Sequence, residues 1–331
     1  MANESPIRVA VVGVGSFGRN HARVYHDLQK QGAGVELAAV VDSDPAQAQA
    51  VASQFGCSAL ATVEDLFGRV EAASVAVPTM HHRGVAAALM AAGIDVLIEK
   101  PLASTLAEAD ELLSLANANQ RIVQVGHLER FNPAVQATLP ILTSPMFFEV
   151  HRLSVFTPRS LDVDVVLDLM IHDLDIVLAF AKSPVREVRA VGLPVLSGKV
   201  DIANVRLEFE SGCIANFTAS RVSTERVRKL RFFQPRQYVS LDYGRQEVLV
   251  FSVGSDGPAA GMPSVNPQIG VNKLAVAAEE PLHAELKSFL NAVRERSTPV
   301  VSLEDGRRAL GAALEIVSAI REHGKKVGLK N

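Results

Sequence analysis

Three polar residues near the middle of the chain have a spacing suited to moving protons. Asp168, His172 and Asp175 occupy positions i, i+4 and i+7 of the segment 163–181, whose apolar pattern predicts a helix with all three on one face. Buried carboxylate and imidazole groups are costly unless they are paired. We therefore interpret His172 as a general acid/base with a carboxylate to orient it. A capping or solvated polar stripe, and more distantly a metal site, remain alternative interpretations.

A second candidate for chemistry is Lys100, which follows a strand-like run and lies between Glu99 and Pro101. Proline restricts the backbone of the residue before it, so an extended Lys100 is expected. A lysine held there could hydrogen-bond to the oxygen of a substrate hydroxyl or carbonyl while a hydride is transferred. A surface lysine at a strand end is the ordinary alternative.

The first strand-like run of the chain ends in a glycine turn that fits the G-x-G-x-x-G pattern at Gly13, Gly15 and Gly18. The first glycine permits the sharp turn, the second lets the backbone approach a pyrophosphate, and the third lets a helix pack on the strand. The next run ends at Asp42, whose carboxylate could hold a ribose 2′-hydroxyl. These features predict a dinucleotide site; an ordinary strand–turn–helix is the alternative.

The elements that must position these residues alternate between strand and helix in the first third of the chain. The strand-like runs are short and apolar, as in parallel strands buried on both faces. They are 8–12, 36–41, 58–61, 73–77, 95–98 and 121–125. Helical patterns lie between them, with caps at Asp44 and Thr105. This alternation predicts an α/β Rossmann domain, with a doubly wound parallel sheet, over residues 1–125.

Ligands of such sheets bind outside the carboxyl ends of the strands. The glycine turn, the segment 77–82 and the segment 99–101 follow the first, fourth and fifth strands, so we expect them at one edge. For His81 and His82, a place on the first turn of a helix is the plain alternative. The cofactor-binding residues predicted here are Gly13, Gly15, Ser16, Phe17, Gly18, Asp42, Pro78, Thr79, His82, Glu99 and Lys100.

The pattern changes after residue 125. Helices are expected over 131–142 and 163–181, and the other strand-like runs follow one another with turn signals. These runs are 147–154, 185–196, 202–209, 214–220, 226–233, 238–242 and 247–253. Strands in succession predict an α+β domain over 126–331 with a large, mostly antiparallel, open sheet. A loop is expected over 252–272, followed by two closing helices.

Two further sets of residues are candidates for substrate contact. His127 and Arg130 lie where the two predicted domains join, a place where a cleft is expected. A salt bridge between Glu129 and a nearby base is an equally good interpretation. The stretch 221–245 is rich in arginine and could bind a substrate phosphate. A solvated sheet face or a charged subunit contact is the favoured interpretation of that stretch.

Composition excludes several classes of protein. The chain has 331 residues, enough for two domains, and a net charge of -3, which argues against general affinity for nucleic acid. Cys57 and Cys213 are far apart and predict neither a disulfide framework nor a cysteine metal site. The first residues lack the pattern of a signal peptide, and no apolar run is long enough to span a membrane. We expect a cytoplasmic protein.

Taken together, these motifs resemble those of the Gfo/Idh/MocA oxidoreductase family, in order and spacing over nearly the whole chain. The motifs are the glycine turn, Pro78 with His82, residues 99–101, and the set Asp168, His172 and Asp175. The resemblance implies hydride transfer between NAD and a sugar or cyclitol, with Lys100 and His172 as the catalytic pair. It implies Asp168 as a carboxylate on the substrate side and a homodimer or homotetramer formed through the open sheet. No metal is expected, because one histidine with two aspartates at these spacings is too little for a metal site. Asp42 favours NAD over NADP, because a 2′-phosphate would meet a carboxylate.

Residues 126–133 and 238–243 further resemble members of the family that oxidise the 3-hydroxyl of UDP-N-acetylglucosamine on the way to 3-amino sugars of lipid A. That resemblance implies His127, Arg130, Asp168, His172 and Asp175 as substrate-binding residues. Within enzymes, the alternative is a dehydrogenase of a free sugar or inositol. In another class, the alternative is a non-catalytic NAD-binding protein that regulates a partner.

Overall fold

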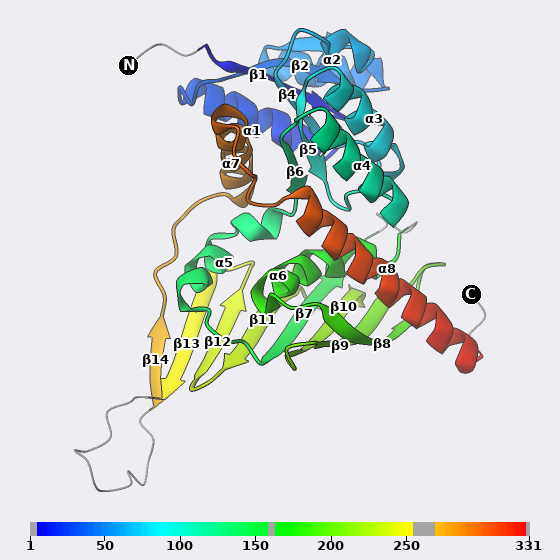
Figure 1. The fold of residues 1–331 in the computed structure, drawn as a ribbon, viewed down its shortest axis with the longest axis vertical. Coiled ribbons are helices and arrows are strands. Elements are labelled where there is room, and N and C mark those ends of the chain that lie inside the picture. Colours follow the sequence, from blue (N-terminus) through cyan, green and yellow to red (C-terminus); the bar gives the residue numbers. More distant parts are fainter. Residues whose placement is uncertain (1–4, 158–162, 254–268, 329–331) are drawn as a thin grey trace, which may run out of the picture. The chain divides into compact units, whose positions relative to one another are not determined.

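Two β-sheets organise the chain, and each forms the centre of one compact unit (Figure 1). The computed structural model describes residues 5–157, 163–253 and 269–328. The first unit comprises residues 1–131 and 280–310, and the second comprises residues 132–279 and 311–331. Within the described ranges, no helix has the length and apolar composition of a membrane span.

The sheet of the first unit has six parallel strands in the order β3-β2-β1-β4-β5-β6. This is the strand order of a doubly wound dinucleotide-binding fold, so the predicted fold class is confirmed. The strands are β1 (Ile7–Val12), β2 (Val35–Val41), β3 (Ser58–Leu60), β4 (Ala72–Val75), β5 (Asp95–Glu99) and β6 (Val123–Gly126). The central strands are buried on both faces, which explains why their sequences lack alternation.

Helices cover both faces of this sheet. In Figure 1, α1 and α7 lie together on one face and α3 and α4 on the other. The helices are α1 (Gly18–Lys30), α2 (Pro45–Phe55), α3 (Thr79–Ala91), α4 (Leu106–Ala118), α7 (Pro281–Glu295) and the first turns of α8 (Leu303–Lys326). The predicted caps are present: Asp44 accepts hydrogen bonds from two backbone N–H groups, and Thr105 accepts one from Glu108.

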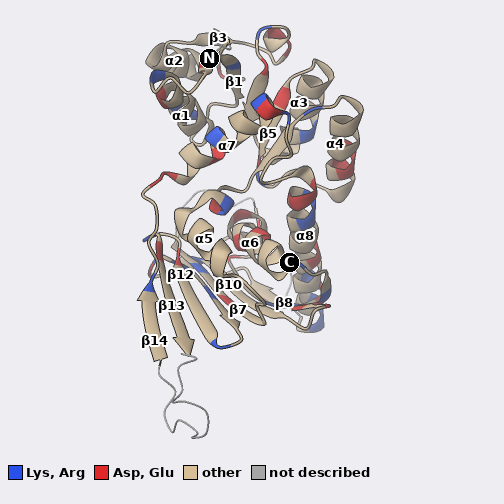
Figure 2. Cartoon of the chain, turned by 60° about the vertical axis from the view of Figure 1, so that its left-hand side comes forward, with Lys and Arg blue, Asp and Glu red and all other residues tan. Residues whose placement is uncertain are grey.

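The helix α7 belongs to the first unit although it comes late in the chain. Its Leu286 and Phe289 are fully buried in the same core as Tyr25 and Leu28 of α1. The boundary that the sequence indicated after residue 125 therefore differs from the observed division, which also gives residues 126–131 and 280–310 to the first unit. Figure 2 shows that α8 carries residues of both charge signs along its length.

The second unit is built on an eight-stranded sheet, in the order β14-β13-β12-β11-β7-β10-β9-β8. Among the described strands of this sheet, only β7 and β10 pair in parallel, so the predicted, mostly antiparallel sheet is confirmed. The strands are β7 (Phe147–Val155), β8 (Val185–Leu193), β9 (Ile202–Phe209), β10 (Ile214–Ser223), β11 (Val227–Gln234), β12 (Gln237–Asp242), β13 (Glu247–Val253) and β14 (Ile269–Lys273). Burial alternates along these strands, because helices α5, α6 and α8 lie on one face only (Figure 1).

Two helices of the second unit differ from the sequence-based expectation. The segment 131–142 contains α5 (Pro133–Thr138) with 3₁₀ turns on either side. The segment 163–181 begins with a π-helical turn, Val166–Met170, which leads into α6 (Ile171–Ala181). The expectation of one continuous α-helix from residue 163 was therefore wrong, because a π turn adds a residue that hydrophobic spacing does not reveal.

The loop expected over 252–272 was also partly wrong. Ser252 and Val253 complete β13, and Ile269–Lys273 forms the edge strand β14, which pairs with β13 in antiparallel register. The remainder of the expected loop, 254–268, lies outside the described residues. The Gly and Asn residues of β14 gave the segment a loop-like composition, and only pairing with β13 makes it a strand.

A buried ion pair joins α6 to the sheet of the second unit. Arg152 on β7 donates to both carboxylate oxygens of Asp173 on α6, at 2.6 and 3.0 Å, and both side chains are at most 5% exposed. The guanidinium of Arg152 also lies over the ring of Tyr243, 5.2 Å from its centre. The two-pronged geometry makes this pair directional, so it fixes the rotation of α6 about its own axis.

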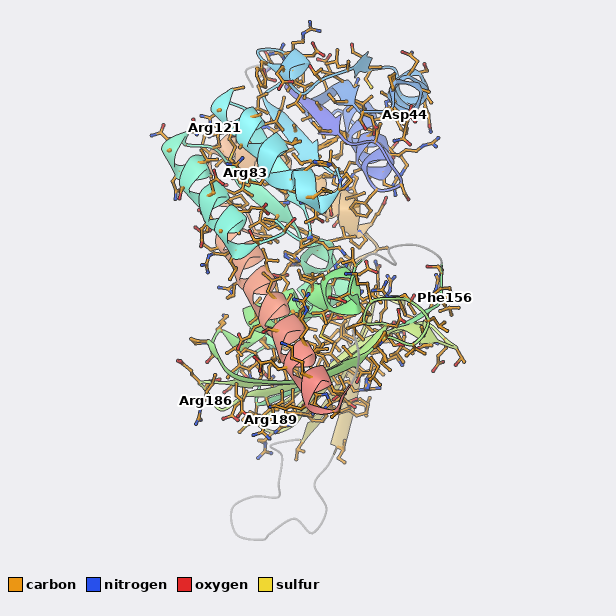
Figure 3. The ribbon with its side chains drawn as sticks, turned by 90° about the vertical axis from the view of Figure 1, so that its right-hand side faces the viewer. Asp44, Arg83, Arg121, Phe156, Arg186 and Arg189 are labelled. Carbon is orange, nitrogen blue, oxygen red and sulfur yellow. The ribbon has the colours of Figure 1, made fainter. Side chains whose placement is uncertain are left out.

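We predict that Arg152→Ala lowers the free energy of unfolding by about 3–5 kcal/mol, since it removes the two-pronged guanidinium contact from the buried Asp173 carboxylate. Urea unfolding followed by circular dichroism measures the change. Arg186→Ala is the matched control, because Arg186 pairs with Glu208 on the exposed edge of the same sheet (Figure 3) and should contribute about 1 kcal/mol or less. Equal losses in both variants would contradict the assigned role.

Candidate active site

The carboxyl ends of β1, β4 and β5 lie side by side, because these strands are neighbours in one parallel sheet. The turn after β1 is fixed on both sides: Gly13 donates its N–H to the Val41 carbonyl, and Ala76 donates to the Val12 carbonyl, each at 2.8 Å. The structure thus brings the three predicted turns to one edge of the sheet. That edge, where the strand order reverses, is the place where doubly wound sheets bind ligands.

The three glycines of the turn differ in how much space a side chain would have at each position. Gly13 has φ +83°, and a Cβ there would lie 2.8 Å from the Ala76 carbonyl carbon. A Cβ on Gly18 would lie 1.8 Å from the Gly13 carbonyl oxygen. A Cβ on Gly15 would meet no described atom within 4 Å, so packing of the protein does not require glycine there. The open backbone at Gly15 fits the close approach of a pyrophosphate.

Asp42 follows β2 and holds the glycine turn in place. Its carboxylate accepts hydrogen bonds from the Val14 N–H at 2.7 Å, the Asp44 N–H at 2.9 Å and the Gln47 side chain at 3.0 Å. Burial alone would raise the pKa of the Asp42 carboxyl, but these hydrogen bonds outweigh burial and lower the pKa below its usual value. Asp42 therefore stays anionic beside the turn, as contact with a ribose hydroxyl requires.

His82 links the two other turns. Its Nδ1 lies 3.0 Å from the Pro101 carbonyl oxygen and its Nε2 lies 2.9 Å from the Val77 carbonyl oxygen. The ring is buried, and burial lowers the pKa of His82 despite those two carbonyls. The observed contacts make His82 a clamp between the turns after β4 and β5; its predicted contact with the cofactor stays a prediction.

The turn after β5 positions Lys100. The preceding Glu99 is buried, and its Oε2 accepts the Lys100 N–H at 3.3 Å. Its Oε1 lies 3.1 Å from Nε2 of His21 on α1, an ion-pair distance without the angle of a hydrogen bond. A Cβ at Gly126, the neighbour of Glu99 on β6, would lie only 2.7 Å from Oε1. The carboxylate of Glu99 thus lies against the backbone of Gly126, inside the protein, and accepts the backbone N–H of Lys100.

The other candidates of the first unit have ordinary surroundings. Phe17 is 40% exposed and packs against the ring of His21, next to the exposed Ser16. Pro78 caps α3, which begins at Thr79. His127 is buried behind the end of β6.

Arg130 lies in the 3₁₀ turn Leu128–Phe131, and its guanidinium is 3.7 Å from the Asp305 carboxylate. Arg130 thus forms a salt bridge with Asp305, and the pair between Glu129 and a nearby base stays a prediction. Its partner, Asp305, is far away in sequence and could not be named from spacing.

The polar triplet of the second unit is split by the π turn. Asp168 lies within the turn, whereas His172 and Asp175 lie on α6. Asp168 and His172 are partly exposed, and Asp175 is buried. A partly exposed acid four residues from a partly exposed imidazole is compatible with proton transfer to a ligand, whereas Asp175 is buried on α6.

The arginine-rich stretch 221–245 is largely paired within the sheet. Arg221 is 3.7 Å from Asp201 and donates to the Val163 carbonyl, and Arg231 is 3.2 Å from Glu149. These partners favour the interpretation of a charged sheet face over that of a phosphate site. Burial raises the pKa of Asp201, but hydrogen bonds from Ser197 and neighbouring N–H groups outweigh it and lower that pKa to about 2.

Sequence reasoning missed two groups beneath the edge of the parallel sheet. Neither His21 of α1 nor Glu285 of α7 was among the candidate residues. Both are fully buried, and His21 contacts the Glu99 carboxylate. In the sequence, each is a polar residue within the apolar face of a helix. That pattern does not show which residues the helix face contacts.

Comparison with known proteins gives the class. Residues 7–127 match the model of an oxidoreductase family with an NAD-binding Rossmann fold, and residues 147–238 match that of the GFO/IDH/MocA C-terminal domain. The chain is 36% identical over 315 residues to the UDP-N-acetylglucosamine 3-dehydrogenase of Acidithiobacillus ferrooxidans, which covers 95% of this chain and 97% of that protein. A solved structure of that enzyme superposes with a TM-score of 0.87 at 34% identity, covering 95% and 97% of the two chains. An inositol 2-dehydrogenase of Arthrobacter sp. is 27% identical over 98% of this chain and 96% of its own length.

The fold and these similarities define an NAD-binding oxidoreductase. The chain belongs to the Gfo/Idh/MocA family. The residues at the sheet edge fit the cofactor: Gly15 leaves room for a pyrophosphate, and Asp42 presents an anionic carboxylate next to it.

We predict that Gly15→Ala and Gly18→Ala separate cofactor binding from folding. Gly15→Ala should leave the thermal midpoint within about 2 °C of the wild type and weaken NAD binding at least about tenfold, because the new methyl group occupies only open space. Gly18→Ala should lower the midpoint strongly, because its methyl group collides with Gly13. Thermal unfolding and fluorescence titration with NAD measure the two effects. A large loss of stability in Gly15→Ala would contradict the assignment.

Proposed function

We propose that this protein oxidises the 3-hydroxyl of UDP-N-acetylglucosamine with NAD. The observation that carries the proposal is the similarity, over 95% of the chain, to an enzyme named for that reaction. Lys100 after β5 and His172 on α6 supply the chemical groups that oxidation of an alcohol needs. Bound NAD would accept the hydride, and the protein's own residues would handle the proton and the oxygen.

In this proposal His172 accepts the proton of the sugar hydroxyl, since imidazole is the side chain best matched to proton transfer near neutral pH. Lys100 hydrogen-bonds to the same oxygen and stabilises the negative charge that develops on it. Asp168 is partly exposed; in this proposal it binds the substrate, and its carboxylate offsets the positive charge that His172 gains with the proton. His127, Arg130 and Asp175 complete the proposed substrate-binding residues, and the two catalytic residues belong to different units of the chain.

We further propose that the open face of the eight-stranded sheet forms the contact of a homodimer or homotetramer. Four aromatic rings follow one another across that face: Phe147, Phe233, Tyr238 and Phe251. The Phe233 and Tyr238 rings stack at 4.7 Å, and Tyr238 and Phe251 at 5.0 Å. A row of half-buried rings of this kind is typical of the surface that subunits bury.

The proposed product is a 3-keto sugar, which an aminotransferase would convert into a 3-amino sugar of the kind found in lipid A. A cytoplasmic location is consistent with the two cysteines, Cys57 and Cys213, which are both free thiols.

The substrate is tested by the reduction of NAD with UDP-N-acetylglucosamine, free N-acetylglucosamine and myo-inositol, in the presence of a carbonyl trap that draws the reaction forward. We expect turnover with the UDP-sugar only. Turnover with the free sugar or the inositol alone would contradict the proposed substrate, and NAD binding without any turnover would favour a regulatory protein.

We predict that Lys100→Ala lowers kcat about 100- to 10,000-fold and changes NAD affinity less than about threefold, because the ammonium group acts on the substrate oxygen. Steady-state kinetics and NAD titration measure the two quantities. Lys30→Ala, at an exposed site on α1 in the same unit, is the control and should match the wild type. If Lys100→Ala lost NAD affinity and turnover in equal proportion, Lys100 would be a cofactor ligand instead.

We predict that Asp42→Ala reduces the preference for NAD over NADP by about tenfold or more, measured as the ratio of the two kcat/KM values. The ratio is the proper readout, since loss of the hydrogen bond to Val14 also loosens the glycine turn for both cofactors. Asp44→Ala removes the helix cap two residues away and should cost about 1 kcal/mol of stability without altering the ratio. An unchanged preference in Asp42→Ala would place the ribose contact elsewhere.

A further inference from the structure

Next to the Lys100 turn, inside the first unit, lies a group of four buried polar side chains, of which only Glu99 is among the predicted site residues. They come from four elements of the first unit: His21 of α1, Glu99 of β5, Gln124 of β6 and Glu285 of α7. The strand register places Gln124 opposite Leu97, two residues before Glu99, so the side chains of Glu99 and Gln124 lie on the same face of the sheet. That face is the one that α1 and α7 cover (Figure 1).

Glu285 is the unusual member of this group. It is 0% exposed, and neither carboxyl oxygen has a hydrogen-bond partner among the described residues. Its backbone carbonyl accepts the side-chain amide of Gln124 at 3.2 Å, which fixes α7 to the sheet at this position. An ionised carboxylate without a partner is strongly disfavoured in such surroundings, so the geometry requires the neutral acid.

The groups around Glu285 also favour its neutral form. The elements packed against α7 carry His21 and Tyr25 on α1, and Glu129 and Arg130 in the 3₁₀ turn. Strand β5, which carries Glu99, contributes Leu97 to the same core. Burial, followed by the charge of Glu99, raises the pKa of the Glu285 carboxyl well above its usual value. Arg130 is near Asp305. The Tyr25 hydroxyl is 2.9 Å from the Ser74 hydroxyl.

We propose that Glu285 is a positioning residue for Lys100: it remains an uncharged carboxylic acid beneath Glu99, so that Glu99 carries the single negative charge that holds the turn. Glu99 Oε1 lies 3.1 Å from His21 Nε2, and Glu99 Oε2 accepts the Lys100 N–H at 3.3 Å. A second negative charge on Glu285 would repel the Glu99 carboxylate, which lies against the backbone of Gly126 where there is no side chain. Displacement of Glu99 removes the acceptor of the Lys100 N–H. The inference rests on the proposed role of Lys100 as a catalytic residue.

The first test measures folding and needs no substrate. A carboxyl whose pKa is higher in the folded than in the unfolded state stabilises the protein fully below its unfolded pKa of about 4.3, and that stabilisation is lost as the pH rises through the folded pKa. Relative to Glu285→Gln, the unfolding constant of the wild type should therefore rise up to about tenfold per pH unit over that window. Urea unfolding at a series of pH values gives the constants.

Two more variants sharpen this measurement. Glu295→Gln changes an exposed glutamate on the same helix and should follow the wild type at every pH. Glu99→Gln removes the neighbouring charge, so the pH at which the wild-type slope ends should move down. Identical pH dependence in the wild type and Glu285→Gln would overturn the proposal. If Glu285→Gln does not fold, infrared spectra of the wild type decide: a protonated carboxyl band at neutral pH supports the neutral acid, and its absence overturns it.

The second test is kinetic. Glu285→Gln, which keeps a neutral group of the same size, should retain kcat within about twofold at neutral pH with an unchanged KM for the sugar. The wild-type kcat should fall at the pH where the stability slope ends, and Glu285→Gln should lack that fall. Equal kcat profiles, despite different unfolding profiles, would overturn the positioning role. Failure of the enzyme to oxidise any sugar would refute the proposed function and leave the unfolding result standing.

Discussion

The close packing of the glycine turn between β1 and β4 is the constraint on which the first unit depends. Gly18 approaches the Gly13 carbonyl more closely than any side chain allows, and Gly13 itself lies against the end of β4. Gly13 and Gly18 are closely packed, whereas the backbone at Gly15 is open at the carboxyl edge of the sheet. The His82 ring then joins the turns after β4 and β5, so the cofactor edge and the Lys100 turn form one connected structure.

Charged groups buried inside each unit hold the candidate catalytic residues. In the second unit, the Arg152–Asp173 pair fixes the rotation of the helix that carries His172. In the first unit, Glu99 is held between His21 and the Lys100 N–H. Paired buried charges need specific geometry in order to repay their desolvation, and the same geometry orients the backbone next to them. The reactive side chains thus stay partly exposed on supports that are themselves rigid.

Much of this arrangement could be predicted from the sequence, because it depends on local patterns. The apolar runs that became β1 to β6, the caps at Asp44 and Thr105, and the glycine turn all express rules that act within a few residues. What could not be predicted depends on contacts between distant segments. Glu285 contacts Gln124 of the sheet although it lies 161 residues further along the chain. Strand β14 exists only through its pairing with β13, and the π turn before α6 leaves no mark in hydrophobic spacing.

The central claim is that the hydride leaves carbon 3 of the sugar of UDP-N-acetylglucosamine. Substrate carrying deuterium at carbon 3 tests it directly, when it is incubated with the enzyme and unlabelled NAD and the reduced cofactor is examined by mass spectrometry. The account predicts that the NADH formed gains the deuterium and that the sugar loses it. NADH without deuterium, formed while the sugar keeps its label, would contradict the account, because the hydride would then come from another carbon.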